Sequence, residues 1–152
     1  MSKKVITILF FITALLLTGC AASVQMASKE EDSALKNFTQ PPSDKAGLYI
    51  YRNSIIGQAV SKEVYVDSIL IGETANGVYF YLEITPGTHT ISSESEFGEN
   101  SAMFQAEGGK NYFAEQYIKM GIFVAGSGVE MVDEEVGMKE VLECSLAARQ
   151  KF

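Results

Sequence analysis

The sequence predicts a mainly β fold, an antiparallel β-sandwich of about seven to nine strands. Between residues 46 and 133, short runs rich in Val, Ile, Tyr and Phe alternate with breaks of Gly, Asn, Asp or Pro. Runs at this spacing are typical of sandwiches and small barrels. The predicted strands are Gly47–Arg52, Lys62–Val66, Ile69–Glu73, Gly77–Ile84, His89–Glu96, Ser101–Glu107, Tyr112–Lys119 and Val129–Asp133.

Several breaks between these strands have the chemistry of tight turns. Asn76-Gly77 supplies residues that tolerate positive φ, and Pro86-Gly87 is placed as in a type II turn. Gly108-Gly109-Lys110 predicts a hairpin turn rather than a phosphate loop, because Asn111 stands where that loop needs Ser or Thr.

Two short helices flank the predicted strands. Ser28 and Glu31 have capping-box spacing, which predicts a helix over about residues 29–37. A C-terminal helix begins after Asp133, an N-cap candidate followed by two acidic residues. Its apolar positions predict packing along an edge of the sheet structure. The residues that share this face are Met138, Val141, Leu142 and Ala148.

The first nineteen residues have the layout of a removable export signal. Lys3 and Lys4 precede thirteen uncharged residues, Val5–Leu17, which as a helix reach roughly 20 Å and are too short to span a bilayer comfortably. Leu17-Thr18-Gly19-Cys20 resembles the lipobox of bacterial lipoproteins. This resemblance implies cleavage before Cys20 and lipidation of that residue, which becomes the membrane anchor.

The chain therefore divides into three parts. Residues 1–19 are the signal peptide, residues 20–45 a lipidated tether containing the short helix, and residues 46–152 a single β-sandwich domain with the C-terminal helix. Ala21 occupies the position where Asp commonly retains lipoproteins at the inner membrane. We expect the protein at the outer membrane, with its domain facing the periplasm.

The mature chain is acidic and has a single unmodified thiol. Loss of Lys3 and Lys4 changes the net charge from −7 to −9, which argues against nucleic acid as a partner. With Cys20 lipidated, Cys144 cannot form an intrachain disulfide. It could cross-link two chains or act as a nucleophile, but its apolar helical context favours a small buried side chain.

Catalytic and metal-binding motifs are weak. The single histidine, His89, predicts a hydrogen-bonded strand residue rather than a zinc ligand, and we expect no metal and no cofactor. Ser127 lacks the glycine spacing of a nucleophile elbow and predicts a flexible loop. Glu94 and Glu96 would share one face of a strand, a spacing that a hydrolytic carboxylate pair could use.

Aromatic side chains are the strongest candidates for binding. Tyr79 and Tyr81 alternate with Phe80 and Leu82, so one strand has large side chains on both faces. One face should be core, and the other is either covered by the C-terminal helix, which we favour, or offered to a partner. Phe123 lies in a glycine-rich apolar loop that either closes one end of the sandwich or contacts a ligand.

Several spaced motifs follow the lipobox-like segment: Val24–Asp32, Lys45–Asn53, Val64–Asp67, Ile71–Thr74, Pro86–Thr90, Lys119–Gly121 and Leu142. In this order they resemble the bacterial lipoprotein family called domain of unknown function 2846. The resemblance covers nearly all of the mature chain, but it implies no catalytic residue, ligand or partner. Residues 64–90 are also similar to PEGA-type β modules, with Ser68 where such modules usually have Gly.

The function expected from the sequence is a non-enzymatic envelope module that binds a protein or a cell-wall component. Tyr79, Tyr81 and Phe123 are the candidate contacts. A periplasmic hydrolase using Glu94 and Glu96 is the alternative, and a purely structural lipoprotein without a specific ligand stays open. The sequence has no cluster of nucleophile, base and metal ligands, so binding is favoured.

Changing Cys20 to Ala should leave an unprocessed, unlipidated precursor, because the thiol that receives the lipid is absent. Mass spectrometry of the wild type should find a chain that begins at residue 20 and carries acyl groups, and these should be missing in the variant. Unaltered processing and unaltered membrane fractionation of the variant would contradict the prediction.

Overall fold

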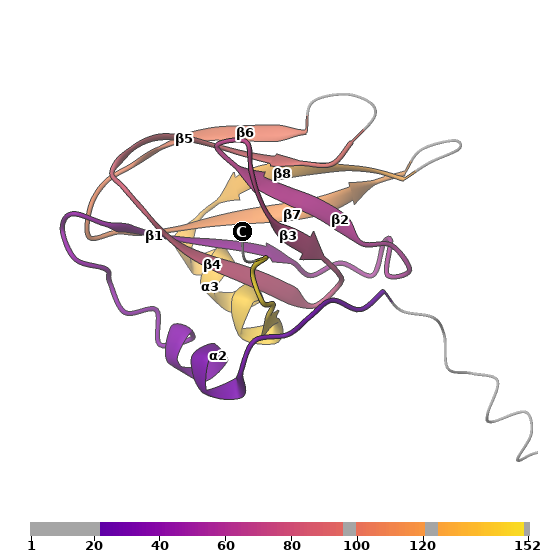
Figure 1. The fold of residues 1–152 in the computed structure, drawn as a ribbon, viewed down its shortest axis with the longest axis horizontal. Coiled ribbons are helices and arrows are strands. Elements are labelled where there is room, and N and C mark those ends of the chain that lie inside the picture. The colour runs from indigo at the N-terminus through magenta and orange to yellow at the C-terminus, as the bar shows by residue number, and fades with distance from the viewer. Residues whose placement is uncertain (1–21, 96–99, 121–124, 151–152) are drawn as a thin grey trace, which may run out of the picture.

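A computed structural model of the chain describes residues 22–95, 100–120 and 125–150. Nine strands form two facing sheets, one of five strands in the order β8-β7-β1-β4-β9 and one of four in the order β3-β2-β5-β6 (Figure 1). The predicted mainly β, sandwich-like fold with two short helices is confirmed. The elements are α2 (Lys29–Leu35), β1 (Ala46–Arg52), β2 (Lys62–Val66), β3 (Ile69–Thr74), β4 (Val78–Ile84), β5 (Gly87–Ser93), β6 (Ser101–Ala106), β7 (Asn111–Lys119), β8 (Gly126–Val132), α3 (Glu134–Glu143) and β9 (Ser145–Leu146).

The expectation of purely antiparallel pairing is wrong at two places. β1 pairs with β7 in parallel, with Tyr49 opposite Phe113, and β4 pairs in parallel with the short β9. Parallel neighbours need a crossover connection, and the segment between β1 and β7 supplies one because it includes the entire four-stranded sheet. Turn chemistry along the chain reports only on neighbouring strands and could not indicate these distant pairings.

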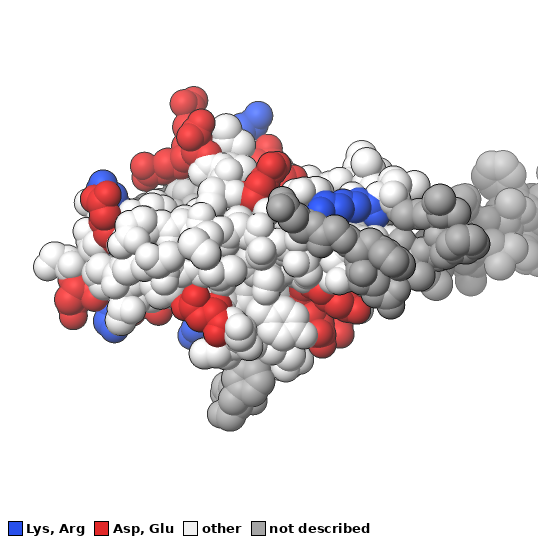
Figure 2. All heavy atoms as spheres, turned by 90° about the horizontal axis from the view of Figure 1, so that it is seen from above, with Lys and Arg blue, Asp and Glu red and all other residues white. Residues whose placement is uncertain are grey.

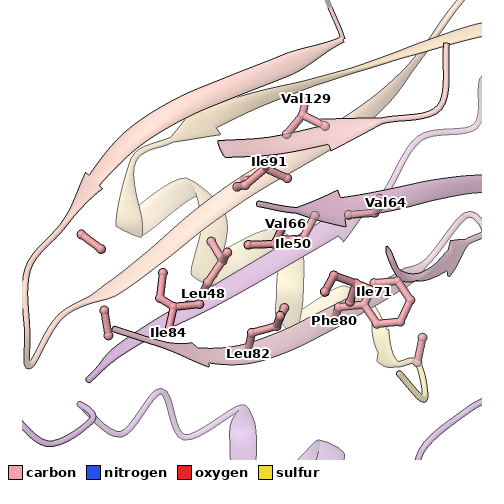
Figure 3. Close-up of a cluster of buried hydrophobic side chains, with 14 of the residues drawn as sticks. Leu48, Ile50, Val64, Val66, Ile71, Phe80, Leu82, Ile84, Ile91 and Val129 are labelled. Carbon is pink, nitrogen blue, oxygen red and sulfur yellow. The ribbon is translucent and has the colours of Figure 1, made fainter. Parts of the chain in front are cut away.

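The main core lies between the two sheets. Alternate residues of β1 and β4, including Leu48, Ile50 and Leu82, face Val64 and Ile91 of the other sheet (Figure 3). All of these side chains are buried. This alternation explains why the two-residue period in the sequence predicted the strands correctly.

A second hydrophobic cluster covers the outer face of the five-stranded sheet. Tyr49, Tyr51 and Tyr79 point away from the main core and are covered by α3 and by the N-terminal segment. At Gly137 an added Cβ would overlap the side chain of Phe113, so this glycine lets α3 approach β7 closely. The favoured interpretation, that the C-terminal helix covers this aromatic face, is correct, although α3 lies over the face rather than along an edge.

The N-terminal segment is part of this second layer rather than a free tether. The ring centroid of Phe38 lies 5.4 Å from that of Tyr49, and the Tyr49 hydroxyl donates to the Leu35 carbonyl at 2.9 Å. Lys36 Nζ donates to the Cys144 carbonyl at 2.6 Å. The apolar side chains after the capping box bind the segment to the domain, so from residue 22 onward it does not act as a spacer.

Of the turns predicted from the sequence, the one at Asn76-Gly77 is present, but Pro86-Gly87 is not a type II turn, because Gly87 begins β5 with a φ of +142° rather than about +80°. Gly77 has a φ of +74°, and Asp67 and Ser68 have φ values of +51° and +68° in the two-residue turn between β2 and β3. The turn at Gly108-Gly109 is not a hairpin, because β6 and β7 belong to different sheets. It carries the chain from one layer of the sandwich to the other.

The chain after α3 differs from the prediction. The helix ends at Glu143, so Ala148 is not on its face, and Leu142 is exposed. Cys144 is a buried free thiol, as expected, and burial raises its pKa to about 12. Residues after it run extended along β4, where Ala147 N–H donates to the Tyr79 carbonyl at 2.8 Å.

The surface is predominantly acidic, in line with the composition. Asp and Glu side chains are scattered over the face shown in Figure 2 and outnumber Lys and Arg there. No continuous basic patch interrupts them on this face.

Changing Phe38 to Ala should lower the free energy of unfolding by about 2 kcal/mol, because its partly buried ring packs against Tyr49 and Phe113. Val136→Ala, at an exposed position of α3, should cost less than about 0.5 kcal/mol. Urea denaturation of both variants tests this. If both variants lose the same small amount of unfolding free energy, the N-terminal segment contributes nothing to the stability of the folded domain.

Candidate functional site

Two strand edges without strand partners lie next to each other on one side of the sandwich. β3 is an edge strand of its sheet and pairs only with β2. β4 lies next to the edge of the other sheet, and β9 covers only Val78 and Tyr79. Among the residues that the structure describes, the stretch of β4 from residue 80 to 84 therefore has no strand partner on this side. Such edges are templates for an additional strand.

An apolar cleft of about 290 Å³ lies between these edges. Leu82 and Ile84 of β4 point into the sandwich interior, and Ile71 of β3 faces them across the gap (Figure 3). Ile69 is 59% exposed at the rim. The full lining is Val66, Ile69, Leu70, Ile71, Leu82, Ile84, Arg149 and Gln150.

The C-terminal segment partly closes the cleft from outside. Gln150 N–H donates to the Ile71 carbonyl at 2.9 Å, and Ala148 N–H donates to the Gln25 carbonyl at 2.8 Å. Arg149 and Gln150 also line two wider grooves, of about 580 and 630 Å³, beside the N-terminal segment. The chain's own extended backbone thus already uses one hydrogen-bonding position of the β3 edge.

An ion pair holds the hairpin that forms one wall of the cleft. His89 Nδ1 lies 2.6 Å from Asp67 Oδ2, and His89 Nε2 lies 2.7 Å from the Thr85 carbonyl. Asp67 Oδ1 accepts from Thr90 N–H at 2.9 Å. Both ring nitrogens face acceptors, which favours the doubly protonated ring. His89 is thus a hydrogen-bonded strand residue, as the sequence predicted.

The pKa values of this pair move in opposite directions. Burial opposes the charge on His89, but its hydrogen bonds to Asp67 and to the Thr85 carbonyl outweigh burial and raise its pKa. Burial also opposes the charge on Asp67, but the Thr90 N–H and His89 outweigh it and lower the pKa of this carboxyl. Both shifts indicate that the charged pair is favoured in the folded protein.

The residues proposed from the sequence as binding contacts occupy different environments. Tyr79 is 0% exposed in the aromatic layer and cannot contact a ligand while that layer is packed. The prediction that Tyr79 is a binding contact is therefore wrong. Tyr81 is partly buried and lines two grooves beside the N-terminal segment. Phe123 and Cys20 lie outside the described residues.

Of the polar residues weighed as catalytic groups, Ser127, Glu94 and Glu96, the structure describes the first two. Ser127 is not in a flexible loop: it is buried in β8, 2.7 Å from Ser93 Oγ, and also donates to the Glu94 carbonyl. Glu94 is exposed beyond the end of β5, 3.9 Å from Lys62 Nζ, and Glu96 lies outside the described residues. Nothing in this arrangement supports the hydrolase alternative.

A buried polar network went unrecognised in the sequence. Gln116 of β7 accepts from the Thr74 hydroxyl and donates to Ser93 Oγ at 2.5 Å, which links both sheets through the interior. All three side chains are buried. No local pattern marks Gln116, because its partners are 23 and 42 residues away along the chain.

Arg52 is a second polar residue that sequence reasoning missed. Its side chain is 0% exposed, and it donates to the carbonyls of Val60 at 2.9 Å, Thr74 at 3.4 Å and Gly57. Burial lowers its pKa. Arg52 therefore fixes the loop that follows β1, and the only local signal for this role is a charge at the end of an apolar run.

In the part of the chain that the structure describes, no group of three His, Cys, Asp or Glu side chains is arranged to hold a metal ion. No helix in residues 22–95, 100–120 or 125–150 combines the length and the apolar character needed to cross a bilayer.

The Asp67–His89 pair should stabilise the protein in a defined pH window. The contribution of His89 is fully present below its unfolded pKa of about 6.5 and is lost as pH rises through its higher folded pKa. The contribution of Asp67 is present above its unfolded pKa of about 3.9 and is lost as pH falls through its lower folded pKa. Stabilisation is therefore greatest between these two unfolded values.

The measurement compares the wild type with His89→Gln by urea unfolding at about pH 5.5 and about pH 9. The difference in unfolding free energy between the wild type and His89→Gln should be smaller by roughly 0.5–1 kcal/mol at the higher pH. This value is modest because the Asp67 side chain is about half exposed, and solvent screens the pair. Asp67→Asn should behave like His89→Gln. A difference that is the same at both pH values would rule out the charged pair.

Comparison with known proteins identifies the family. The family model described as "Protein of unknown function (DUF2846)" matches residues 42–128. A protein of Haemophilus influenzae, described as an uncharacterized protein, is 48% identical over 134 residues, which are 88% of this chain and 79% of the relative. The matched region contains all the strands from β1 to β7 and the strands on both sides of the cleft. The chain therefore belongs to the DUF2846 family.

Proposed function

We propose that this protein is a lipid-anchored envelope lipoprotein whose domain is a non-catalytic binding module facing the periplasm. The anchor is supported by the lipobox-like Leu17–Cys20 after a short apolar segment. Ala21 supports the outer membrane as its location. The ligand in this proposal is an extended polypeptide segment of another envelope protein.

The observation that carries the binding proposal is the apolar cleft between the edges of β3 and β4. A peptide that adds a strand to a sheet edge gains main-chain hydrogen bonds, and pockets for alternate side chains give specificity. The cleft offers such a pocket beside each edge. Gln150 donates to Ile71 from an extended conformation, which shows that backbone can approach this edge.

The backbone of β4 presents hydrogen-bonding groups toward this side. The Tyr79 carbonyl accepts from Ala147, so it faces outward, and the two-residue period directs the backbone groups of Tyr81 and Glu83 to the same side. Glu83 is exposed. A donor strand would use these groups while it places an apolar side chain against Leu82 or Ile84.

The test is site-specific photocrosslinking in intact cells from position 69, at the rim of the cleft. A defined envelope protein should be captured through one extended segment. Glu83→Pro should abolish this adduct, because it removes an outward N–H without removing a donor to β1. Glu83→Ala removes the same side chain, keeps the N–H and should retain the adduct.

A crosslinker at Met103, exposed on the far edge strand β6, is the positional control and should not capture the same protein. Circular dichroism should show that the Glu83 variants keep the β fold. An adduct that persists in Glu83→Pro, or that forms equally from positions 69 and 103, would overturn binding by strand addition at this cleft.

A further inference from the structure

The loop between β1 and β2 exposes apolar side chains on a backbone that is well held. Ile55 is 83% exposed and Ile56 is 51% exposed. Beneath them, Arg52 donates to the carbonyls of Gly57 and Val60 from the protein interior. The exposure therefore belongs to a fixed loop conformation, and large apolar side chains held in water in this way mark an interaction surface.

Further contacts fix the two ends of this loop. Ser54 N–H donates to Asn76 Oδ1 at 2.7 Å, and Ile56 N–H donates to Ser54 Oγ at 3.2 Å. At Gly57, an added Cβ would come within 2.7 Å of the Ile118 side chain, so the loop packs against the end of β7. Residues 53–61 include no charged residue.

Met120 is a third exposed apolar side chain, and it follows the strand that neighbours β1. β1 and β7 run parallel, so their last residues, Arg52 and Lys119, lie at the same end of the molecule. Met120 follows directly and is 83% exposed. Ile55, Ile56 and Met120 together are called the apolar end below.

The start of the described chain lies at this same end. Ala22 N–H donates to the Gln58 carbonyl at 2.9 Å, which joins the N-terminal segment to the loop. Figure 1 shows the indigo start of the chain and the loop after β1 at one end of the sandwich. Two residues span at most about 7 Å, so Cys20 lies within that distance of residue 22.

We propose that the apolar end is a membrane-docking surface, on which Ile55, Ile56 and Met120 enter the headgroup region of the bilayer that holds the Cys20 lipid. This inference rests on the lipid anchor of the proposed function. The hydrogen bond from Ala22 to Gln58 places the attachment point beside the apolar end, so anchoring brings this surface to the bilayer. Apolar side chains bind the interface in proportion to the area they bury there.

The opposite end of the sandwich has a different character. Its turns expose Asp44, Asp67, Glu107 and Lys110, which stay in water. With a net charge of −9 after signal removal, the domain gains no general electrostatic attraction to anionic lipid. Contact through apolar side chains with zwitterionic lipid suits the charges on this molecule.

The test uses the full lipidated protein in phosphatidylcholine vesicles that contain brominated acyl chains as fluorescence quenchers. Single cysteines at position 55 or 44 receive the same fluorophore. Cys144 is buried, with a pKa raised to about 12 by that burial, and stays unlabelled, while the Cys20 thiol is occupied by lipid. Quenching at position 55 should exceed quenching at position 44 by about threefold or more.

A second arm places the fluorophore at position 120 and compares two substitutions. Ile55→Ser with Ile56→Ser should reduce quenching at position 120 by about threefold, because the docking surface loses most of its apolar area. Met103→Ser changes an exposed apolar residue of the edge strand β6, outside both proposed surfaces, and should leave this quenching unchanged. Equal quenching at positions 55 and 44, or no effect of the double substitution, would overturn membrane docking.

Mass spectrometry of the same samples separates the two proposals. If Cys20 carries acyl groups and positions 55 and 44 are quenched equally, the docking surface is wrong and the anchor stands. If Cys20 carries no lipid and position 55 does not bind the vesicles, both proposals fail. If the unlipidated chain still shows selective quenching at position 55, docking stands and the proposed anchor is overturned.

Discussion

The burial of β1 on both faces is the constraint on which the rest of this structure depends. Every residue of β1 is buried, with Leu48 and Ile50 toward the other sheet and Tyr49 and Tyr51 toward the helices. A sheet with large apolar side chains on both faces needs two covering layers. The four-stranded sheet supplies one layer, and α3 with the N-terminal segment supplies the other. The N-terminal segment is thereby recruited into the fold.

Buried polar groups then determine what happens at the end of that strand. Arg52 ends the apolar run of β1, and the two terminal nitrogens of its guanidinium donate to backbone carbonyls of the next loop and of β3. Thr74 and Gln116 continue this polar interior between the sheets. Because a buried donor without a partner is costly, these bonds select one loop conformation. That conformation directs Ile55 and Ile56 outward.

The two proposed surfaces occupy different parts of the sandwich and do not compete. The apolar end lies at the loops that follow β1 and β7, next to the start of the described chain. The cleft lies along the side, where β3 and β4 leave their edges without strand partners. A domain docked on the bilayer through its end would keep this side open to a partner in the periplasm. In that case the proposed lipid anchor, the proposed docking surface and the cleft would form one arrangement, in which the membrane orients a binding edge.

The sequence by itself determined the strand boundaries within a few residues and the capping box of α2, because each depends on residues close together in the chain. It also predicted the environments of His89 and Cys144. Only the tertiary structure decided the parallel pairing of β1 with β7, the burial of Tyr79, and the roles of Arg52 and Gln116. These features depend on contacts between distant segments, which turn chemistry and periodicity do not encode. The cleft belongs to the same class, because it exists only where two sheets and the C-terminal segment meet.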